Sequence, residues 1–117
     1  MRLLKQNWKS KKKYEFAYNP KISIIVPTYE TPEIFLREMI ESVQRQTYSN
    51  WELCIADGSV SDQVMQVIQA YAQADKRIIA KKLTENKGIA DNTNAAIAIA
   101  SGEYIALLDH DDLLAPD

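Results

Sequence analysis

Short runs of apolar and β-branched residues alternate along the chain with longer segments in which apolar residues recur every three or four positions. The short runs predict strands over 22–26, 51–56, 77–82 and 104–108. Between them, the longer segments predict helices from 31 or 32 to about 46, from 61 or 62 to about 74, and over 90–100. Strand and helix alternate, and connections this short require a parallel sheet with right-handed crossovers. The pattern therefore predicts an α/β fold with four strands and three helices.

The predicted helices carry recognisable end signals. Thr31 offers an N-cap to the first helix and Pro32 suits its first turn, while Ser61 or Asp62 caps the second and Gly102 ends the third. Each of the first two helices has an apolar stripe expected to face the sheet. These residues are Phe35, Leu36, Met39, Ile40 and Val43 in the first helix, and Val64, Val67, Ile68 and Tyr71 in the second.

Composition limits the chain to one folded domain, since 117 residues with 46% apolar content bury one core. Charge is uneven within a net charge of −2: seven lysines and arginines stand against a single glutamate in the first 21 residues. We expect residues 1–20 to be a basic leader or linker and residues 21–117 to be the domain. Two interpretations of the leader stay open, a solvated linker or a contact with anionic lipid or a phosphate-bearing partner.

Cys54 is the only cysteine, so no disulfide forms within the chain, and its apolar neighbours predict a buried thiol. No stretch reaches the roughly 18 apolar residues that span a bilayer, and the N-terminus lacks the apolar segment of a signal peptide. These features favour a cytoplasmic location, with the basic leader as the one candidate for peripheral contact with the cytoplasmic membrane face.

Polar clusters follow each of the four predicted strands. They lie at 27–30, 57–59, 85–88 and 109–112. In an open parallel sheet, ligands bind outside the carboxyl ends of the strands, so we expect these clusters to converge on one rim. Each cluster is also compatible with an ordinary turn, and their combination is what indicates a binding site.

The residue types in these clusters suit a nucleotide and a divalent cation. Tyr29 can flank a base, Asp57 can accept a hydrogen bond from a base N–H, and Gly88 allows close approach of the backbone. Asp109 and Asp111 present the carboxylate oxygens that Mg²⁺ or Mn²⁺ prefers. Turn formation for Asp57, packing for Tyr29 and helix capping for Asp111 stay open as alternatives.

Lys87 and His110 are two further polar residues near the same site. Lys87 offers a cation to a phosphate, or it is a solvated loop lysine. His110, the only histidine, should point away from the face that its neighbours Asp109 and Asp111 share, so we expect no direct chemical role for it.

Five segments of the chain form a pattern whose order and spacing, taken together, are specific for one protein family. They are Ile22 to Tyr29, Asp57 to Ser59, Asn86 to Gly88, Asn94, and Gly102 to Asp112. Together they resemble the N-terminal, nucleotide-binding portion of glycosyltransferase family 2. The resemblance covers about residues 21–117 and implies the Rossmann-like GT-A fold of nucleotide-diphospho-sugar transferases, cut after its fourth strand. One position departs from the family, which often has a basic residue where this chain has Thr93.

The resemblance also implies roles for individual residues. The pocket for the nucleotide would be lined by Pro27, Thr28, Tyr29, Glu30, Lys87 and Gly88. Asp57 would read the base, most often uracil, Asp109 would face the ribose or sugar, and Asp111 with Asp109 would bind Mn²⁺ or Mg²⁺. The reaction would be inverting sugar transfer from a nucleotide-diphospho-sugar to an acceptor saccharide or lipid-linked saccharide, with no nucleic acid involved. The family's general base lies downstream, so we expect no catalytic base before Asp117 and no turnover by these residues alone.

Two other functions are compatible with parts of the sequence. The run from Ile105 to Leu113 superficially matches the aspartate nucleophile segment of haloacid-dehalogenase-like phosphatases, although those enzymes carry it on an early strand. The chain could also be a non-catalytic interaction module of a larger synthase that self-associates through an uncovered sheet edge. A Rossmann dehydrogenase is excluded, because Gly58, Gly88 and Gly102 are too scattered to form its glycine-rich loop.

Overall fold

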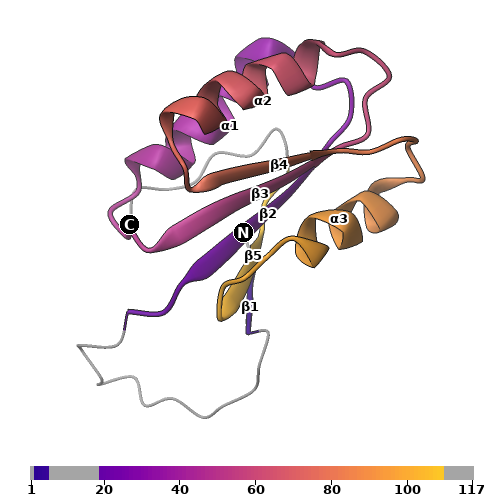
Figure 1. The fold of residues 1–117 in the computed structure, drawn as a ribbon. Helices are drawn as coiled ribbons and strands as arrows, with labels where there is room; N and C mark the ends of the chain where they lie inside the picture. The colour runs from indigo at the N-terminus through magenta and orange to yellow at the C-terminus, as the bar shows by residue number, and fades with distance from the viewer. Residues whose placement is uncertain (1, 6–18, 110–117) are drawn as a thin grey trace.

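A computed structural model describes residues 2–5 and 19–109. Its centre is a five-stranded sheet in the order β1-β5-β2-β3-β4, shown in Figure 1. The strands are β1 (Arg2–Lys5), β2 (Ile22–Thr28), β3 (Trp51–Asp57), β4 (Ile78–Lys82) and β5 (Tyr104–Leu107). The last four are parallel to one another, as predicted, and β1 is antiparallel to β5.

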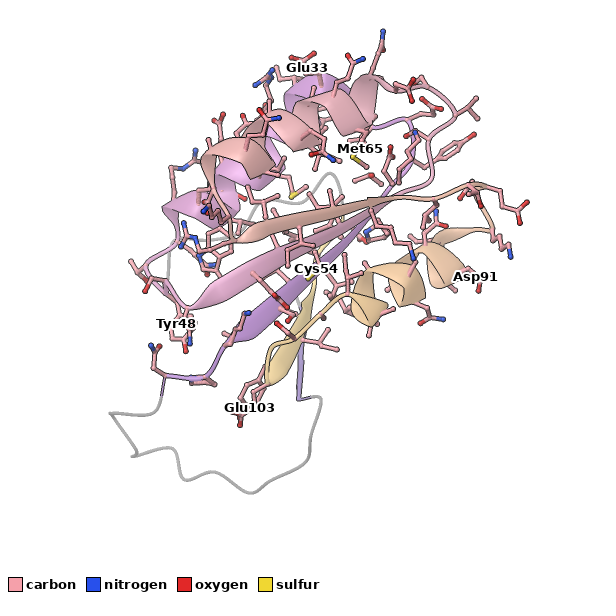
Figure 2. All side chains as sticks on the ribbon, in the orientation of Figure 1. Glu33, Tyr48, Cys54, Met65, Asp91 and Glu103 are labelled. Atoms are coloured by element: carbon pink, nitrogen blue, oxygen red, sulfur yellow. The ribbon has the colours of Figure 1, made fainter. Side chains whose placement is uncertain are left out.

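Three helices cover the two faces of the sheet. Helices α1 (Glu33–Arg45) and α2 (Gln63–Ala74) lie on one face, and α3 (Ile89–Ala98) lies on the other, which Figure 1 shows as three layers. The central strand β3 is buried along its whole length, because helices cover both of its faces. Cys54 lies in its middle with no exposed surface (Figure 2), and burial raises the pKa of its thiol to about 12. The predicted buried thiol is confirmed.

The first strand and the first helix differ from the sequence prediction at their ends. Strand β2 continues through Pro27 and Thr28 instead of ending at Pro27. Proline is accommodated there because β5 pairs with β2 only as far as Ile25, so the missing N–H removes no bond to that neighbour. Pro32 has an extended ψ of 139° and stands as the N-cap, which leaves Thr31 outside the helix and buried.

The predicted apolar stripes are mostly correct. Four of the five expected residues of α1 are fully buried, but Phe35 is 47% exposed and faces away from the core. On α2, Val64 and Ile68 are buried, while Val67 and Tyr71 pack against the same cluster from a half-buried position. Phe35 was misassigned because a stripe of residues three and four apart is wider than the surface that the sheet actually covers.

The sequence pattern did not predict β1. Its register pairs Arg2 with Leu107 and Lys5 with Tyr104, so a piece of the expected leader lies along the outer side of β5. We expected a sheet edge without a pairing strand. It is not at β5, because β1 pairs with the outer side of β5. Strand β4 is the outer strand on the opposite side of the sheet.

A buried polar network joins the amino-terminal ends of the strands. Glu52 is 2% exposed and accepts hydrogen bonds from the Ser23 hydroxyl at 2.5 Å and the Ser101 N–H at 2.5 Å. Lys21 completes it with an ion pair at 3.2 Å. Burial alone would raise the pKa of Glu52, but these donors outweigh burial and lower it to about 2. The network ties β2, β3 and the segment before β5 at the end of the sheet away from the polar rim.

Acidification should therefore weaken the fold through Glu52. A carboxylate whose pKa falls from 4.5 to about 2 on folding stabilises the protein above pH 4.5 and loses that contribution as the pH falls toward 2. We expect the stability difference between wild type and Glu52→Gln to narrow across this window in denaturant unfolding at several pH values. Glu38→Gln, on the exposed face of α1, is the matched control. A difference that stays constant from pH 5 to pH 3 would show that Glu52 does not titrate with folding.

Candidate functional site

Three residues from adjacent strands lie side by side at the carboxyl end of the sheet. The parallel register pairs Thr28 of β2 with Asp57 of β3, and Asp57 with Lys82 of β4. Each is the last residue of its strand. The predicted convergence of the strand ends is thus observed for three of the strands, and Asp57 stands in the middle of the row.

Asp57 has no exposed surface, and both its oxygens are occupied. Its Oδ1 accepts hydrogen bonds from the Thr28 hydroxyl at 2.9 Å and from the Ser59 hydroxyl and N–H at 2.6 and 3.2 Å. Lys82 Nζ lies 3.3 Å from Oδ2. A buried carboxylate is stable only when it is paired in this way. Asp57 therefore connects the ends of β2 and β4 with the loop that follows β3.

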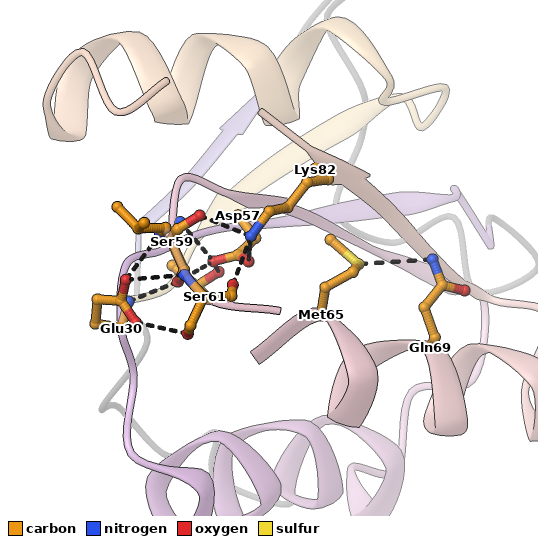
Figure 3. A network of polar contacts seen from close by, with 9 residues as sticks. Glu30, Asp57, Ser59, Ser61, Met65, Gln69 and Lys82 are labelled. Carbon is orange, nitrogen blue, oxygen red and sulfur yellow. Dashed lines mark hydrogen bonds and ion pairs between the residues drawn. The ribbon is translucent and has the colours of Figure 1, made fainter. Parts of the chain in front are cut away.

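The loop that follows β3 is held by two charged side chains, shown in Figure 3. From one side, Lys82 Nζ donates to the carbonyl oxygens of Ser59 and Ser61 at 2.6 and 2.7 Å. From the other side, the Glu30 carboxylate accepts from the Val60 N–H at 2.7 Å and the Ser61 hydroxyl at 3.0 Å. These donors lower the pKa of Glu30, the Val60 N–H most strongly. Glu30 is thus directed at this loop, which keeps the 58–61 backbone in place beside Asp57.

Glu30 holds this position in an unusual backbone conformation. Its φ is 47°, the one positive value recorded for a residue other than glycine in the described part of the chain. Its N–H donates to the Ser59 hydroxyl at 2.7 Å, and that hydroxyl in turn donates to Asp57. The polar partners of Glu30 offset the cost of the left-handed backbone, which is on the order of 1 kcal/mol.

A cavity of about 230 Å³ opens next to this row, between the end of β2 and the start of α3. Tyr29 and Ile89 are its exposed apolar walls, with 48% and 67% of their surfaces accessible. Pro27 and Thr28 line it from the strand, and Asn86 and Asn92 line it from the polar side. This brings predicted site residues from the 27–30 and 85–88 clusters into one cavity.

The loop before α3 carries two further predicted contacts, Lys87 and Gly88. Gly88 has a φ of 102°, a conformation that favours glycine, and nothing lies within 4 Å of the position that a side chain would take. Lys87 is largely exposed and pairs with Glu85 at 3.4 Å. It lines a second, wider cavity together with Lys82 and does not line the cavity beside Tyr29. The two cavities adjoin at Asn92, which lines both.

Asp109 follows β5 at the same end of the sheet and is exposed. The N–H of Leu108 bonds to the Ile25 carbonyl at 3.0 Å, which anchors the chain beside β2 just before the aspartate. Asp111 and His110 lie outside the described residues, and within 2–5 and 19–109 no cluster of three acidic, histidine or cysteine side chains could hold a metal. The oxygen ligand that Asp109 offers at this rim fits a hard cation such as Mg²⁺ or Mn²⁺.

Sequence reasoning missed four residues of this rim: Ser59 as a relay, Ser61 as a loop anchor, Lys82 and Asn92. Lys82 was detectable in principle, because parallel register brings the last residues of neighbouring strands together. Asn92 carried no signal, since it lies inside a helix and its burial depends on how α3 packs.

Comparison with known proteins places the chain among glycosyltransferases. Residues 23–117 match the sequence model of the family described as Glycosyl transferase family 2. An uncharacterized glycosyltransferase of Methanocaldococcus jannaschii is 40% identical over 98 residues, covering 83% of this chain and 34% of that protein. The putative teichuronic acid biosynthesis glycosyltransferase TuaG of Bacillus subtilis is 35% identical, covering 81% of this chain and 37% of that protein. The chain thus spans about a third of the length of these relatives.

Two solved structures share the fold. The mannosyltransferase PcManGT from Pyrobaculum calidifontis, in complex with GDP-Man and Mn²⁺, has a TM-score of 0.77 and 27% identity over 86% of this chain and 30% of that one. TarS from S. aureus, in complex with UDP, has a TM-score of 0.73 and 27% identity over 83% of this chain and 29% of that one. Both similarities support the GT-A fold that the sequence predicts.

Within residues 2–5 and 19–109, the structure contains no helix long and apolar enough to cross a bilayer.

Proposed function

Because the chain belongs to glycosyltransferase family 2, we propose that it is the donor-binding part of an enzyme that transfers a sugar from a nucleotide-diphospho-sugar, with uridine as the expected nucleoside. The single observation that carries this proposal is the convergence of four strand ends. The buried Asp57 row, the Tyr29 cavity and Asp109 all lie at the carboxyl edge of one parallel sheet. Ligands bind at this edge in open α/β sheets.

Each proposed contact uses the chemistry present at the rim. Tyr29 and Pro27 offer an apolar surface to a base, and the backbone around Gly88 approaches the ligand closely because no side chain intervenes. Asp109 and Asp111 are proposed as ligands of Mn²⁺ or Mg²⁺. When bound, that ion supplies charge neutralisation at the diphosphate.

Inverting transfer breaks the bond between the anomeric carbon and the diphosphate oxygen and forms a bond to an acceptor hydroxyl. The hydroxyl proton passes to a carboxylate acting as general base. Glu30 and Asp57 are engaged in hydrogen bonds, and Asp109 is assigned to the donor. We therefore propose that the base, the acceptor site and any turnover require residues outside this set.

Two further proposals concern partners. Contact with a membrane face through the basic segment involves residues 6–18, which lie outside the described residues. The proposed acceptor is a saccharide or a lipid-linked saccharide in the complete enzyme. The phosphatase alternative loses its basis, because the glycosyltransferase match includes the acidic cluster on which that alternative rested.

Donor binding is tested by titrating UDP into the 117-residue chain by calorimetry, with and without Mn²⁺. We expect Mn²⁺ to increase UDP affinity at least about tenfold and Asp111→Ala to remove that increase, since even the loss of a residue that only orients a metal ligand typically costs about 10- to 100-fold in metal affinity. The metal-free affinity should change little in this variant, because the base and the ribose keep their contacts.

Asp112→Ala is the matched control, as it removes the same charge from the adjacent position and should keep the Mn²⁺ effect. If UDP binds with equal affinity with and without Mn²⁺ in all three proteins, the metal assignment is wrong. If UDP does not bind under either condition, the donor-site assignment is wrong.

A further inference from the structure

Strand β1 precedes the part of the chain that matches the glycosyltransferase family, which begins at residue 23. It is antiparallel to β5, and the register pairs Arg2 with Leu107. Because Leu107 is the last residue of β5, Arg2 lies at the carboxyl edge of the sheet. This is the edge at which the donor is proposed to bind. A strand from outside the family match therefore reaches the proposed donor site.

The same pairing fixes the face of the sheet on which Arg2 lies. Two residues directly opposite each other in an antiparallel pair belong to the same face, so Arg2 shares the face of Leu107. Leu107 packs in the hydrophobic cluster on the α3 side of the sheet, and so does Ile25, its partner on β2. Arg2, Leu107 and Ile25 thus stand in one row across three strands, on the side where α3 lies.

Asp109 follows this row on the same face. It is two residues beyond Leu107, and the bond from the Leu108 N–H to a carbonyl oxygen of β2 continues the ladder up to that point. The cavity beside Tyr29 opens between the end of β2 and the start of α3, on the same side of the sheet. The backbone positions of Arg2 and Asp109 are therefore about 8 Å apart, one strand spacing across the sheet and two residues along it. That separation is within the reach of an arginine side chain.

Two other lysines at this end of the sheet are already paired. Lys82 is 3.3 Å from Asp57 Oδ2 and donates to two carbonyl oxygens of the loop after β3. It also stands on β4, which is three strand spacings, or about 14 Å, from β5. Lys87 pairs with Glu85 at 3.4 Å and lines the wider cavity that Lys82 also lines. Strand β1, by contrast, is the direct neighbour of the strand that leads to Asp109.

We propose that Arg2 is a further binding residue of the donor site, where it contributes a positive charge to the diphosphate of the bound nucleotide. This inference rests on the proposed function. A guanidinium donates two parallel hydrogen bonds to phosphate oxygens, and these bonds are strong because both partners are charged. Asp109 also attracts a cation, but a diphosphate carries more negative charge than one carboxylate, and Asp109 is assigned to the metal. The segment before the family match then takes part in donor binding.

The test compares UDP with uridine, which lacks the diphosphate. NMR chemical-shift titrations of the 117-residue chain in the presence of Mg²⁺ measure both affinities. In Arg2→Gln, UDP affinity should fall about tenfold, because one charged contact is lost, and uridine affinity should stay the same. The fall should shrink as the ionic strength rises, since salt screens charges near solvent. Arg2→Lys keeps the charge without the paired donors and should lose less affinity than Arg2→Gln.

Lys5→Gln is the matched control. It removes the same charge from the same strand, about 10 Å away at the amino end of β5 and on the opposite face, so both affinities should stay unchanged. Thermal unfolding of each variant checks that the fold is intact, and Arg2→Lys provides the answer if Arg2→Gln does not fold.

Four results would overturn the inference while leaving the donor site in place. UDP affinity could stay unchanged in Arg2→Gln, fall equally in Arg2→Gln and Lys5→Gln, or fall together with uridine affinity. A gain in UDP affinity would instead identify Arg2 as a counter-ion of Asp109 that competes with the metal. If neither UDP nor uridine binds to the wild type, the proposed function itself is rejected.

Discussion

Replacing Gly102 with alanine is expected to lower the free energy of unfolding by about 3 kcal/mol, the upper part of the range for overpacking a closed site. A Cβ at this position would lie 2.6 Å from the Ser23 hydroxyl, 2.7 Å from the Lys21 carbonyl oxygen and 2.8 Å from the Ser23 N–H nitrogen. Two of these atoms belong to the backbone at the start of β2, so relief requires moving the strand. The Gly102 N–H also donates to the Ser23 hydroxyl at 2.8 Å.

The damage would extend to Glu52, because the Ser23 hydroxyl that Gly102 contacts is also a donor to that carboxylate. Urea unfolding followed by circular dichroism measures the loss. Gly88→Ala is the matched control, since that position has open space around it and only its φ of 102° opposes a side chain. We expect this control to cost about 1–2 kcal/mol, because a φ of 102° with a ψ of 168° lies in a region that residues other than glycine rarely adopt. If the Gly102→Ala protein were as stable as the Gly88→Ala protein, the backbone at the start of β2 would be able to move away from the added Cβ at little cost in free energy.

Replacing Asp57 with alanine is expected to cost about 3 kcal/mol as well, the lower end of the range for breaking a buried ion pair. The lower end applies because Lys82 keeps 32% of its side chain exposed and regains some hydration. The Thr28 hydroxyl is 1% exposed and would lose its acceptor, and the Ser59 N–H would lose one as well. Nucleotide binding should fall with stability, because the loop of residues 58–61 loses its central anchor.

A double-mutant cycle separates the charge from the hydrogen bonds. Asp57→Asn keeps an acceptor for Thr28 and Ser59 and loses the attraction to Lys82, so it should cost less than Asp57→Ala. Lys82→Met, combined with each aspartate variant, measures the coupling between the two side chains. Urea unfolding gives the four stabilities of each cycle. If Asp57→Ala were no more destabilising than Asp57→Asn, the hydroxyl and N–H donors around Asp57 would contribute nothing, contrary to their burial.

The positions of the helices and strands were predictable because local patterns are strong in this chain. The apolar run that forms β3 is buried on both faces, and such runs predict a covered parallel strand from composition alone. The end of β2 was missed because proline normally ends a strand, whereas here the neighbouring strand stops short of it. Strand β1 was missed because its pairing with β5 joins residues about a hundred positions apart.

The candidate site was predictable in its location and only partly in its residues. Asp57, Thr28, Tyr29 and Gly88 were identified from their place after predicted strands, and the structure brings them to one rim. Glu30 was assigned to the pocket, yet its carboxylate holds the loop after β3. Asp57 was assigned to the base, and the structure adds contacts of its carboxylate with Thr28 and Lys82; its role toward a base stays a prediction. Whether a polar side chain contacts a ligand or another protein group depends on residues that lie far away in sequence.

By itself, the sequence determined the α/β order, the buried strands and the edge of the sheet at which a ligand would bind, because each of these follows from local periodicity or from residues next to strand ends. The family followed from the resemblance of several motifs taken together. Only the tertiary structure decided that Lys82 and Glu30 hold the loop beside Asp57, that Glu52 ties the opposite end of the sheet, and that Asn92 is buried and donates a hydrogen bond to Asn86. The physical reason is that the burial of a polar residue and its hydrogen-bond partners depend on contacts between segments that are distant in sequence. These contacts form only when the strands and helices pack together.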